Sequence, residues 1–268
     1  MTYYKRMMSC LLAWGFTMAM IWSSFQSARS EALRLSREEE DVLEVSMALE
    51  DGPGGTPYQI EESLDEVMTG IELRELPVRC MLDVPFVYQE PELPTGCESV
   101  ALTMLLLYEG FDLEKTTIAD DYLLYSENGD FSEGYIGDPY SCEGAGCFPP
   151  SLVRTANLFL KEHGSVKQAV NLSGRSLEEL FHYLADGIPV AVWGTQYMAD
   201  TWIYEMGFEE DGIEYHWYEN EHCVVLSGYD LEKEILMVND SLEGVVERDL
   251  ESFAFIYNET GQYALAIL

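Results

Sequence analysis

The sequence predicts an α+β fold, in which helices come first along the chain and an antiparallel sheet follows. Helix-type spacing of apolar residues, with helix start and stop signals, fills residues 96–186. Short runs rich in β-branched and aromatic residues fill the chain from residue 188 onward. With 268 residues, of which 47% are apolar and 12% aromatic, the chain can bury a sizeable core. This order of elements is typical of the α+β class.

The amino-terminal part has the layout of an export signal followed by a spacer. Within residues 1–30, two basic residues precede an apolar run from Met7 to Trp22, and a candidate cleavage site follows Ser30. Roughly 16 apolar residues are few for a spanning helix, so a cleaved signal peptide and an uncleaved membrane anchor both stay open. Residues 31–79 are acidic and poor in aromatic residues, which indicates a stalk or pro-segment. Residues 80–268 have the composition of a folded domain.

Within this domain the elements can be placed one by one. Alternating apolar residues in LDVPFVY (82–88) predict a strand, which Pro85 assigns to a sheet edge. Periodicity and capping signals predict helices over residues 96–109, 117–125, 150–163, 177–186 and 250–258. Four further strands are expected in IPVAVWGTQ, HCVVLSGY, EILMVND and YALAIL.

The net charge restricts the partners. The chain has 14 Lys and Arg against 49 Asp and Glu, which gives a formal charge of −35. Such a surface excludes a general binder of nucleic acid or of anionic membranes, and it attracts cationic partners. The simpler interpretation is that the acidity keeps an exported protein soluble.

Cys97 is the first candidate for chemistry. Thr95 and Glu98 have the spacing of a capping box, which predicts that the helix begins with Thr95 as its cap and Cys97 in its first turn. Cys97 shares an apolar stripe with Val100 and Met104, so its thiol faces the domain. The positive end of a helix favours the thiolate, and we therefore expect a lowered pKa for Cys97. A buried cysteine that only fills the core is the alternative.

A nucleophilic cysteine needs a base and a group that orients the base. Of the four histidines, His222 opens a predicted strand and is the best candidate. The next strand ends at Asp240, which lies opposite His222 on one face if the intervening turn has an odd number of residues. An even turn would make Asn239 the substitute. His163 and His182 sit in predicted helices and are expected to be structural, and His216 lies in an irregular aromatic stretch.

The other cysteines suggest a structural role. Cys142 and Cys147 are close enough in a Gly-rich loop for a disulfide, although the geometry is strict. A zinc site there would need two more ligands, and none is evident. Cys80 and Cys223 are expected to be buried thiols.

Five segments carry a resemblance to the bacteriocin-processing, double-glycine-leader cysteine peptidases of family 39. They occur in the order VPFVYQEPELPTGCESVALTMLLLYEGF, GDPYSCEGAGCFPPSLV, IPVAVWGT, EHCVVLSGYD and MVNDSLEG. The chain most resembles the stand-alone exported members of Gram-positive bacteria, over about residues 80–268. The resemblance implies a papain-like fold with a catalytic triad of Cys97, His222 and Asp240. It also implies that Gln89 helps to form the oxyanion hole, where its side-chain N–H would join the backbone N–H of Cys97.

Two departures from the family pattern matter. The chain has neither the phosphate-binding motif nor the later membrane spans of the transporter-linked members, so it is not expected to be a leader-processing exporter. Ser241 follows Asp240 where the family usually has proline, and this loosens the turn behind the third triad residue.

Together these observations predict an exported, extracellular or cell-surface cysteine peptidase that acts through a thioacyl-enzyme and needs no cofactor. The resemblance implies cleavage after small residues, including glycine. The expected partner is a peptide or protein, with cationic ones favoured by charge; nucleic acid is not expected, and a membrane is contacted only through the amino-terminal segment. Two alternatives stay open, namely a peptidoglycan amidase or transpeptidase and a non-catalytic peptide-binding module.

Overall fold

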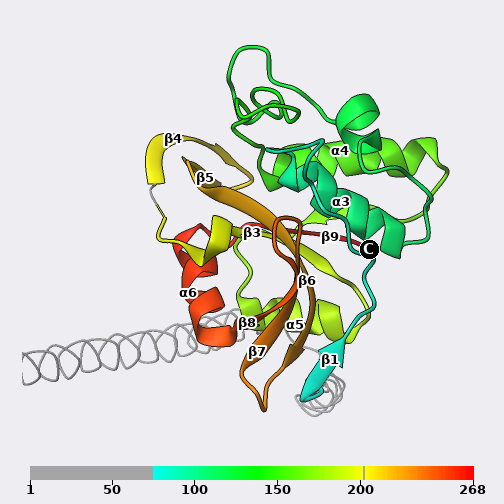
Figure 1. Cartoon of the computed structure of the whole chain (residues 1–268), viewed down its shortest axis with the longest axis vertical. Helices are drawn as coiled ribbons and strands as arrows, with labels where there is room; N and C mark the ends of the chain where they lie inside the picture. The colour runs from blue at the N-terminus through cyan, green and yellow to red at the C-terminus, as the bar shows by residue number, and fades with distance from the viewer. Residues whose placement is uncertain (1–74, 202) are drawn as a thin grey trace, which may run out of the picture. The chain divides into compact units, whose positions relative to one another are not determined.

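The computed structural model describes residues 75–201 and 203–268 (Figure 1). The predicted signal or anchor and almost all of the predicted stalk therefore lie outside the described residues. Within the described part, none of the helices has the length and apolar character needed to cross a bilayer.

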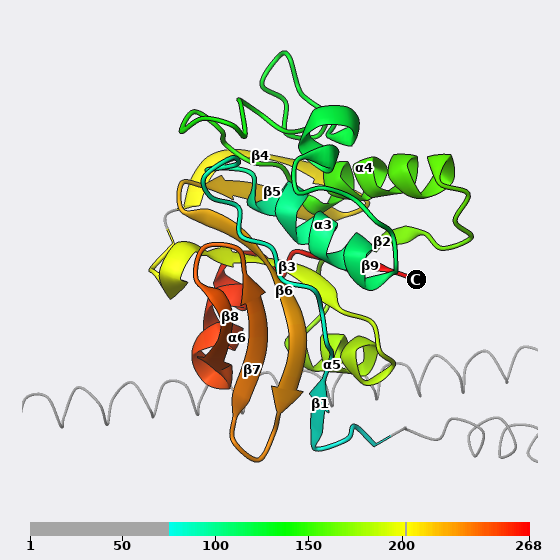
Figure 2. The same cartoon turned by 45° about the vertical axis from the view of Figure 1, so that its right-hand side comes forward.

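A curved antiparallel sheet forms the centre of the domain (Figure 2). Its strands lie in the order β2-β9-β3-β6-β7-β8, and β1 pairs with the far end of β6. The bounds are β1 (Arg79–Met81), β2 (Ala169–Asn171), β3 (Val190–Thr195), β6 (Glu221–Asp230), β7 (Ile235–Asp240), β8 (Gly244–Asp249) and β9 (Ala264–Ile267).

Helices cover both faces of this sheet. They are α3 (Cys97–Tyr108), α4 (Pro149–Glu162), α5 (Leu177–Ala185) and α6 (Leu250–Glu259). Alternate residues of β3 divide the core, since Ala191 and Trp193 pack in one apolar cluster with α3 and α4, while Val190 and Val192 pack in a second one with α5 and α6. The α+β prediction and the helices at 96–109, 150–163, 177–186 and 250–258 are thus confirmed to within one or two residues at their ends.

Two predicted elements differ. The predicted helix at 117–125 is a single π-helical turn over Ile118–Tyr122, closed by a bond from the Leu123 N–H to the Ile118 carbonyl. The predicted strand at 82–88 is wrong, because the regular strand is β1 and pairing with β6 ends at the bond from Leu82 N–H to the Ser227 carbonyl. Pro85 has no N–H to extend the ladder. The chain instead runs on past β7, where the Val84 carbonyl accepts a hydrogen bond from the Asn239 side-chain amide.

The aromatic stretch around His216 is also more regular than the sequence suggested. It belongs to a separate two-stranded sheet of β4 (Ile203–Glu210) and β5 (Ile213–Tyr218). Tyr215 and Tyr218 of β5 are buried, whereas His216 is exposed. A short 3₁₀ turn, Gln196–Met198, connects β3 toward this hairpin.

Candidate active site

Cys97 is the first residue of α3, and its side chain is only 5% exposed. The predicted capping box is wrong. Gly96 is the cap residue and no side chain caps the helix. Thr95 instead donates from its hydroxyl to the Ser141 carbonyl at 2.9 Å, because the loop before α3 is fastened to the Gly-rich loop around residues 138–147. The helix is buried on nearly all sides from Cys97 to Leu106 rather than along one stripe.

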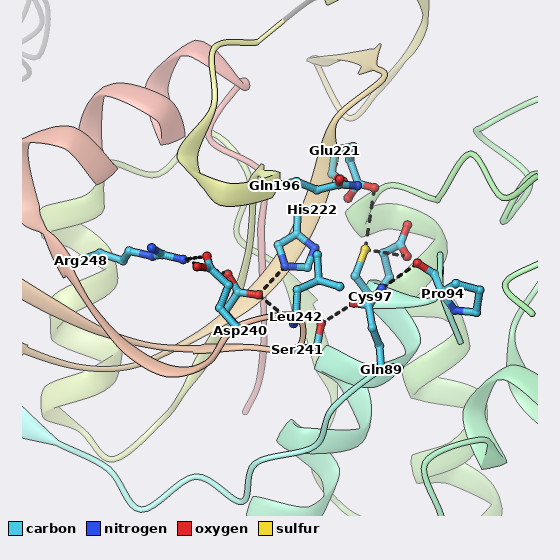
Figure 3. Close-up of polar contacts among 12 residues, drawn as sticks. Gln89, Pro94, Cys97, Gln196, Glu221, His222, Asp240, Ser241, Leu242 and Arg248 are labelled. Atoms are coloured by element: carbon cyan, nitrogen blue, oxygen red, sulfur yellow. Dashed lines mark hydrogen bonds and ion pairs between the residues drawn. The ribbon is translucent and has the colours of Figure 1, made fainter. Parts of the chain in front are cut away.

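His222 and Asp240 meet across neighbouring strands. Their side chains are almost fully buried, and His222 Nε2 lies 2.7 Å from Asp240 Oδ1. In Figure 3 the imidazole lies between the Asp240 carboxylate and the Cys97 sulfur, with its second nitrogen, Nδ1, on the side of the sulfur. The geometry therefore aligns a thiol, an imidazole and a carboxylate in that order.

A β-bulge produces this alignment. Asp230 pairs with Ile235, so the turn between β6 and β7 has an even number of residues, which alone would point His222 and Asp240 to opposite faces. The register shifts by one residue between Leu226 and Gly228, which restores a shared face. Asn239, the alternative partner, binds the hydroxyl of Ser227 and the Val84 carbonyl instead.

The carboxyl group of Asp240 is held in its charged form. Burial alone would raise its pKa, but the hydrogen bond and charge interaction with His222 lower it, helped by the Leu242 N–H and Arg248, to about 2. Leu242 N–H donates to Oδ1 at 3.0 Å and Arg248 contacts Oδ2 at 3.1 Å. An ionised Asp240 fixes the N–H of His222 on Nε2 and leaves Nδ1 for the thiol.

Gln89 also lies at this site, and its side-chain amide is buried. Its Nε2 donates to the Pro94 carbonyl at 2.9 Å, which uses one of its two N–H groups, and it lines a cavity together with Cys97 and His222. Ser241 donates from its hydroxyl to Gln89 Oε1 at 2.6 Å and is fully buried. Sequence reasoning treated Ser241 only as a departure from proline, yet this contact sets which end of the amide faces the cavity.

The environment of the thiol contradicts the sequence-based expectation. Burial raises the pKa of Cys97 well above its usual value, and the carboxylates of Glu221 and Glu98 add to this effect. The Cys97 sulfur lies 3.3 Å from Glu98 Oε2 and 4.0 Å from Glu221 Oε2. The positive end of the helix is therefore outweighed, and the free protein holds Cys97 as a neutral thiol. Sequence reasoning assigned Glu98 to a helix cap and left Glu221 without a role.

A small cavity of about 50 Å³ opens beside these groups. Its walls include the catalytic candidates and the loop residues Gly144, Ala145 and Gly146. A side chain at Gly144 would lie 2.1 Å from the Thr95 hydroxyl, so only glycine fits this wall. A larger cavity of about 420 Å³ near α5 and α6 contains none of the catalytic candidates.

The remaining cysteines and histidines lie outside this arrangement or serve its packing. The predicted disulfide is absent, since Cys142 is an exposed free thiol while Cys147 is buried with its sulfur turned into the core. Cys223 is buried and Cys80 is partly buried and donates to the Leu184 carbonyl. His163 ends α4 and stacks on Phe159 at 4.0 Å between ring centroids, which is the expected structural role.

A buried thiol at a helix start, an imidazole on the adjacent sheet and a carboxylate behind it define the class of the papain-like cysteine peptidases. The chain belongs to the Peptidase_C39 like family, whose model matches residues 81–265. It is 30% identical over 190 residues to the Bacillus subtilis (strain 168) protein YvpB, covering 66% of this chain and 70% of that protein. A crystal structure of a C39-like peptidase from Bacillus anthracis matches with a TM-score of 0.60 and 29% identity, over 71% of this chain and 97% of that chain. These matches confirm the family resemblance and the fold.

Proposed function

We propose that the protein is a cysteine peptidase that cleaves peptide bonds through a thioacyl-enzyme formed on Cys97. The observation that carries this proposal is the buried contact of 2.7 Å between His222 Nε2 and Asp240 Oδ1, with Nδ1 left facing the sulfur (Figure 3). Because Nε2 of this imidazole is bound to Asp240, only Nδ1 can exchange a proton with a reacting group. The family and fold support the same reaction class.

The protonation state of Cys97 sets the order of events. Because Cys97 is a neutral thiol in the free protein, it must lose its proton as it attacks. Nδ1 of His222 takes this proton while the sulfur bonds to the carbonyl carbon, and the resulting imidazolium is stabilised by Asp240. The imidazolium then protonates the leaving amine. A water molecule, deprotonated by His222, releases the acyl group and restores the thiol.

Gln89 is the side-chain donor to the developing oxyanion. The second N–H of its amide and the backbone N–H of Cys97 are the two donors that this role needs. Ser241 acts through Gln89 as a positioning residue, because its hydroxyl occupies the amide oxygen. A donor of this kind is worth about 3 to 4 kcal/mol in the transition state of acyl transfer.

The narrow cavity and the charge favour a particular substrate. A space of about 50 Å³ next to the sulfur accepts small side chains, which supports cleavage after small residues such as glycine. The net charge of −35 favours cationic peptides or proteins over nucleic acid. The apolar run from Met7 to Trp22 favours export, with the domain outside the cell and attached to a membrane, if at all, only through this segment.

A peptide library with small residues before the scissile bond tests the proposal, with products identified by mass spectrometry. The wild type should cleave, and Cys97→Ala should not. Cys142→Ser, which removes an exposed thiol, should behave as wild type. Cleavage of peptidoglycan stem peptides alone would favour the amidase alternative, and binding without cleavage in any library would favour the binding module.

A further inference from the structure

The nucleophile and two neighbouring side chains form a cluster of three potential metal ligands. The proposed reaction gives the cluster no metal-binding role. Cys97 Sγ, one oxygen of Glu98 and one oxygen of Glu221 all lie within 4.8 Å of one another. In the described part of the chain, no Lys or Arg forms an ion pair with either carboxylate. The buried side chains of Cys97 and Glu98 and the half-buried side chain of Glu221 thus lie together without a Lys or Arg partner among the described residues.

We propose that Cys97, Glu98 and Glu221 form a binding site for a divalent zinc-type cation, and that the bound ion masks the nucleophile. The masking of catalysis rests on the proposed peptidase function, whereas the binding of the ion does not.

The spacing of the donors fits zinc. Tetrahedral zinc with one sulfur at about 2.3 Å and oxygens at about 2.0 Å holds sulfur and oxygen about 3.5 Å apart. The observed distances from Cys97 Sγ are 3.3 Å to Glu98 Oε2 and 4.0 Å to Glu221 Oε2, which bracket this value. Shifts of a few tenths of an ångström would therefore complete a three-ligand site.

Glu221 also offers a second, unpaired oxygen to a ligand. Its Oε1 atom is buried and accepts no hydrogen bond from residues 75–201 or 203–268, although a buried carboxylate oxygen is costly to leave unpaired. The residue starts β6, where it pairs with Thr195 of β3, so its backbone is fixed. An ion at the cluster that Glu221 binds through both oxygens, Oε2 beside the sulfur and Oε1, would satisfy the unpaired atom.

Glu98 and Gly146 hold the site together. Glu98 is fully buried, and its Oε1 accepts the backbone N–H of Cys147 at 2.6 Å, which fixes the carboxylate and leaves Oε2 near the sulfur. A Cβ atom at Gly146 would come within 2.6 Å of Glu98 Oε1 and 2.8 Å of Glu221 Oε2. A larger residue here would push the carboxylate ends away from this position, and the φ of +88° also favours glycine.

The donor set selects the type of ion. A thiolate with two carboxylates suits a borderline ion such as Zn²⁺ better than Mg²⁺ or Ca²⁺, which prefer oxygen ligands alone. The cavity of about 50 Å³, lined by Cys97 and Glu221, has room for a water molecule as fourth ligand.

Binding exchanges the thiol proton, together with any proton that the two carboxyl groups hold, for the ion and involves no redox step. The S–H bond of Cys97 breaks, the proton leaves to solvent, and the sulfur lone pair forms a bond to Zn²⁺. While this bond persists, the lone pair is not available to attack a carbonyl carbon. Zinc would thus keep the peptidase latent until a chelator or a stronger ligand removes it.

The test uses the full chain, freed of metal with a chelator, and zinc alone as the probe. Equilibrium dialysis with metal analysis should give one tightly bound zinc per chain, and the absorption band of a cobalt-substituted sample should report a thiolate ligand. Zinc should also protect Cys97 from alkylation, as read by mass spectrometry. None of these readouts needs peptidase activity, so the site can hold even if no peptide is cleaved.

Variants distinguish zinc binding at this site from zinc binding to the acidic surface. Cys97→Ser should abolish the cobalt–thiolate band, and Glu221→Gln should weaken zinc binding by at least about tenfold. Glu221→Asp, which keeps the charge, covers the case in which Glu221→Gln does not fold, and it should retain part of the affinity. Glu127→Gln, at an exposed position, and Cys142→Ser should bind zinc as wild type does. Equal zinc affinity in wild type and Cys97→Ser, or alkylation of Cys97 unaffected by zinc, would overturn the proposal.

Discussion

Replacing Asp240 with asparagine tests the role of the carboxylate with little change of shape. The substitution removes the negative charge that faces His222 at 2.7 Å and Arg248 at 3.1 Å. A hydrogen bond to a charged group is worth about 1.5 to 3 kcal/mol, and it is strongest once the imidazole is protonated. Because each 1.36 kcal/mol corresponds to a factor of ten, kcat/KM should fall about 10- to 150-fold. Steady-state hydrolysis of a cleaved library peptide measures this loss.

The same substitution should also change how stability depends on pH. The pKa of Asp240 is lowered in the folded protein to about 2 from an ordinary value of about 3.9. A lowered pKa stabilises the fold above the ordinary value, and this contribution disappears as the pH falls toward 2. The side chain is only 4% exposed, so a contribution of about 2 kcal/mol at pH 7 is expected. Urea denaturation of wild type and Asp240→Asn should differ by this amount at pH 7 and converge near pH 2.

Asp230→Asn is the matched control. Asp230 is also buried, pairs with Arg79 and Lys233, and lies at the opposite end of β6. Its substitution should lower stability and leave kcat/KM unchanged. If Asp240→Asn kept wild-type activity, or if both variants lost activity equally, the orientation of His222 by Asp240 would not be the basis of catalysis.

Three further changes address the oxyanion donor, the thiol and the bulge. Ser241→Ala frees the amide of Gln89, so kcat should fall about tenfold with little change in KM. A higher KM with an unchanged kcat would contradict this role. In metal-free protein, Glu221→Gln removes a negative charge beside Cys97, so the alkylation rate of Cys97 should begin to rise at lower pH; a profile unchanged from wild type would argue against the charge effect. Gly228→Ala would bring a Cβ within 2.5 Å of a β1 carbonyl oxygen, so the free energy of unfolding should drop by about 1 to 3 kcal/mol in urea denaturation, and an unchanged value would mean that β1 yields easily.

The sequence predicts the elements of the domain well because its helices carry strong local signals. Ser176 and Glu179 form the capping box that the sequence suggests for α5, and Pro149 and Pro150 begin α4. Errors occur where a local signal competes with tertiary contacts. Thr95 has the spacing of a cap, yet its hydroxyl is taken by a loop more than forty residues away.

The candidate site is predictable in its residue types but not in its electrostatics. Cys97, His222 and Asp240 lie together as the sequence suggested, although His222 and Asp240 share a face only because of a bulge at Ser227. Gly228, an isolated glycine inside the predicted strand, is the sequence signal that could have indicated this bulge. The pKa of Cys97 depends on Glu221, which is far away in the sequence. Helix position alone therefore gives the wrong direction for the pKa of Cys97, because the burial of the thiol, which is the larger cause, and the charges of Glu221 and Glu98 arise only in the folded chain.

If Cys97 is the nucleophile, its sulfur carries a peptide acyl group during turnover, and trapping this acyl-enzyme is the direct test. Metal-free protein mixed with an activated ester of a small-residue peptide and quenched in acid within the first turnover should carry one acyl group, which peptide mapping by mass spectrometry assigns to Cys97. His222→Ala should accumulate it far more slowly. An acyl group found on another residue, or no acylated protein while product still forms, would contradict the account.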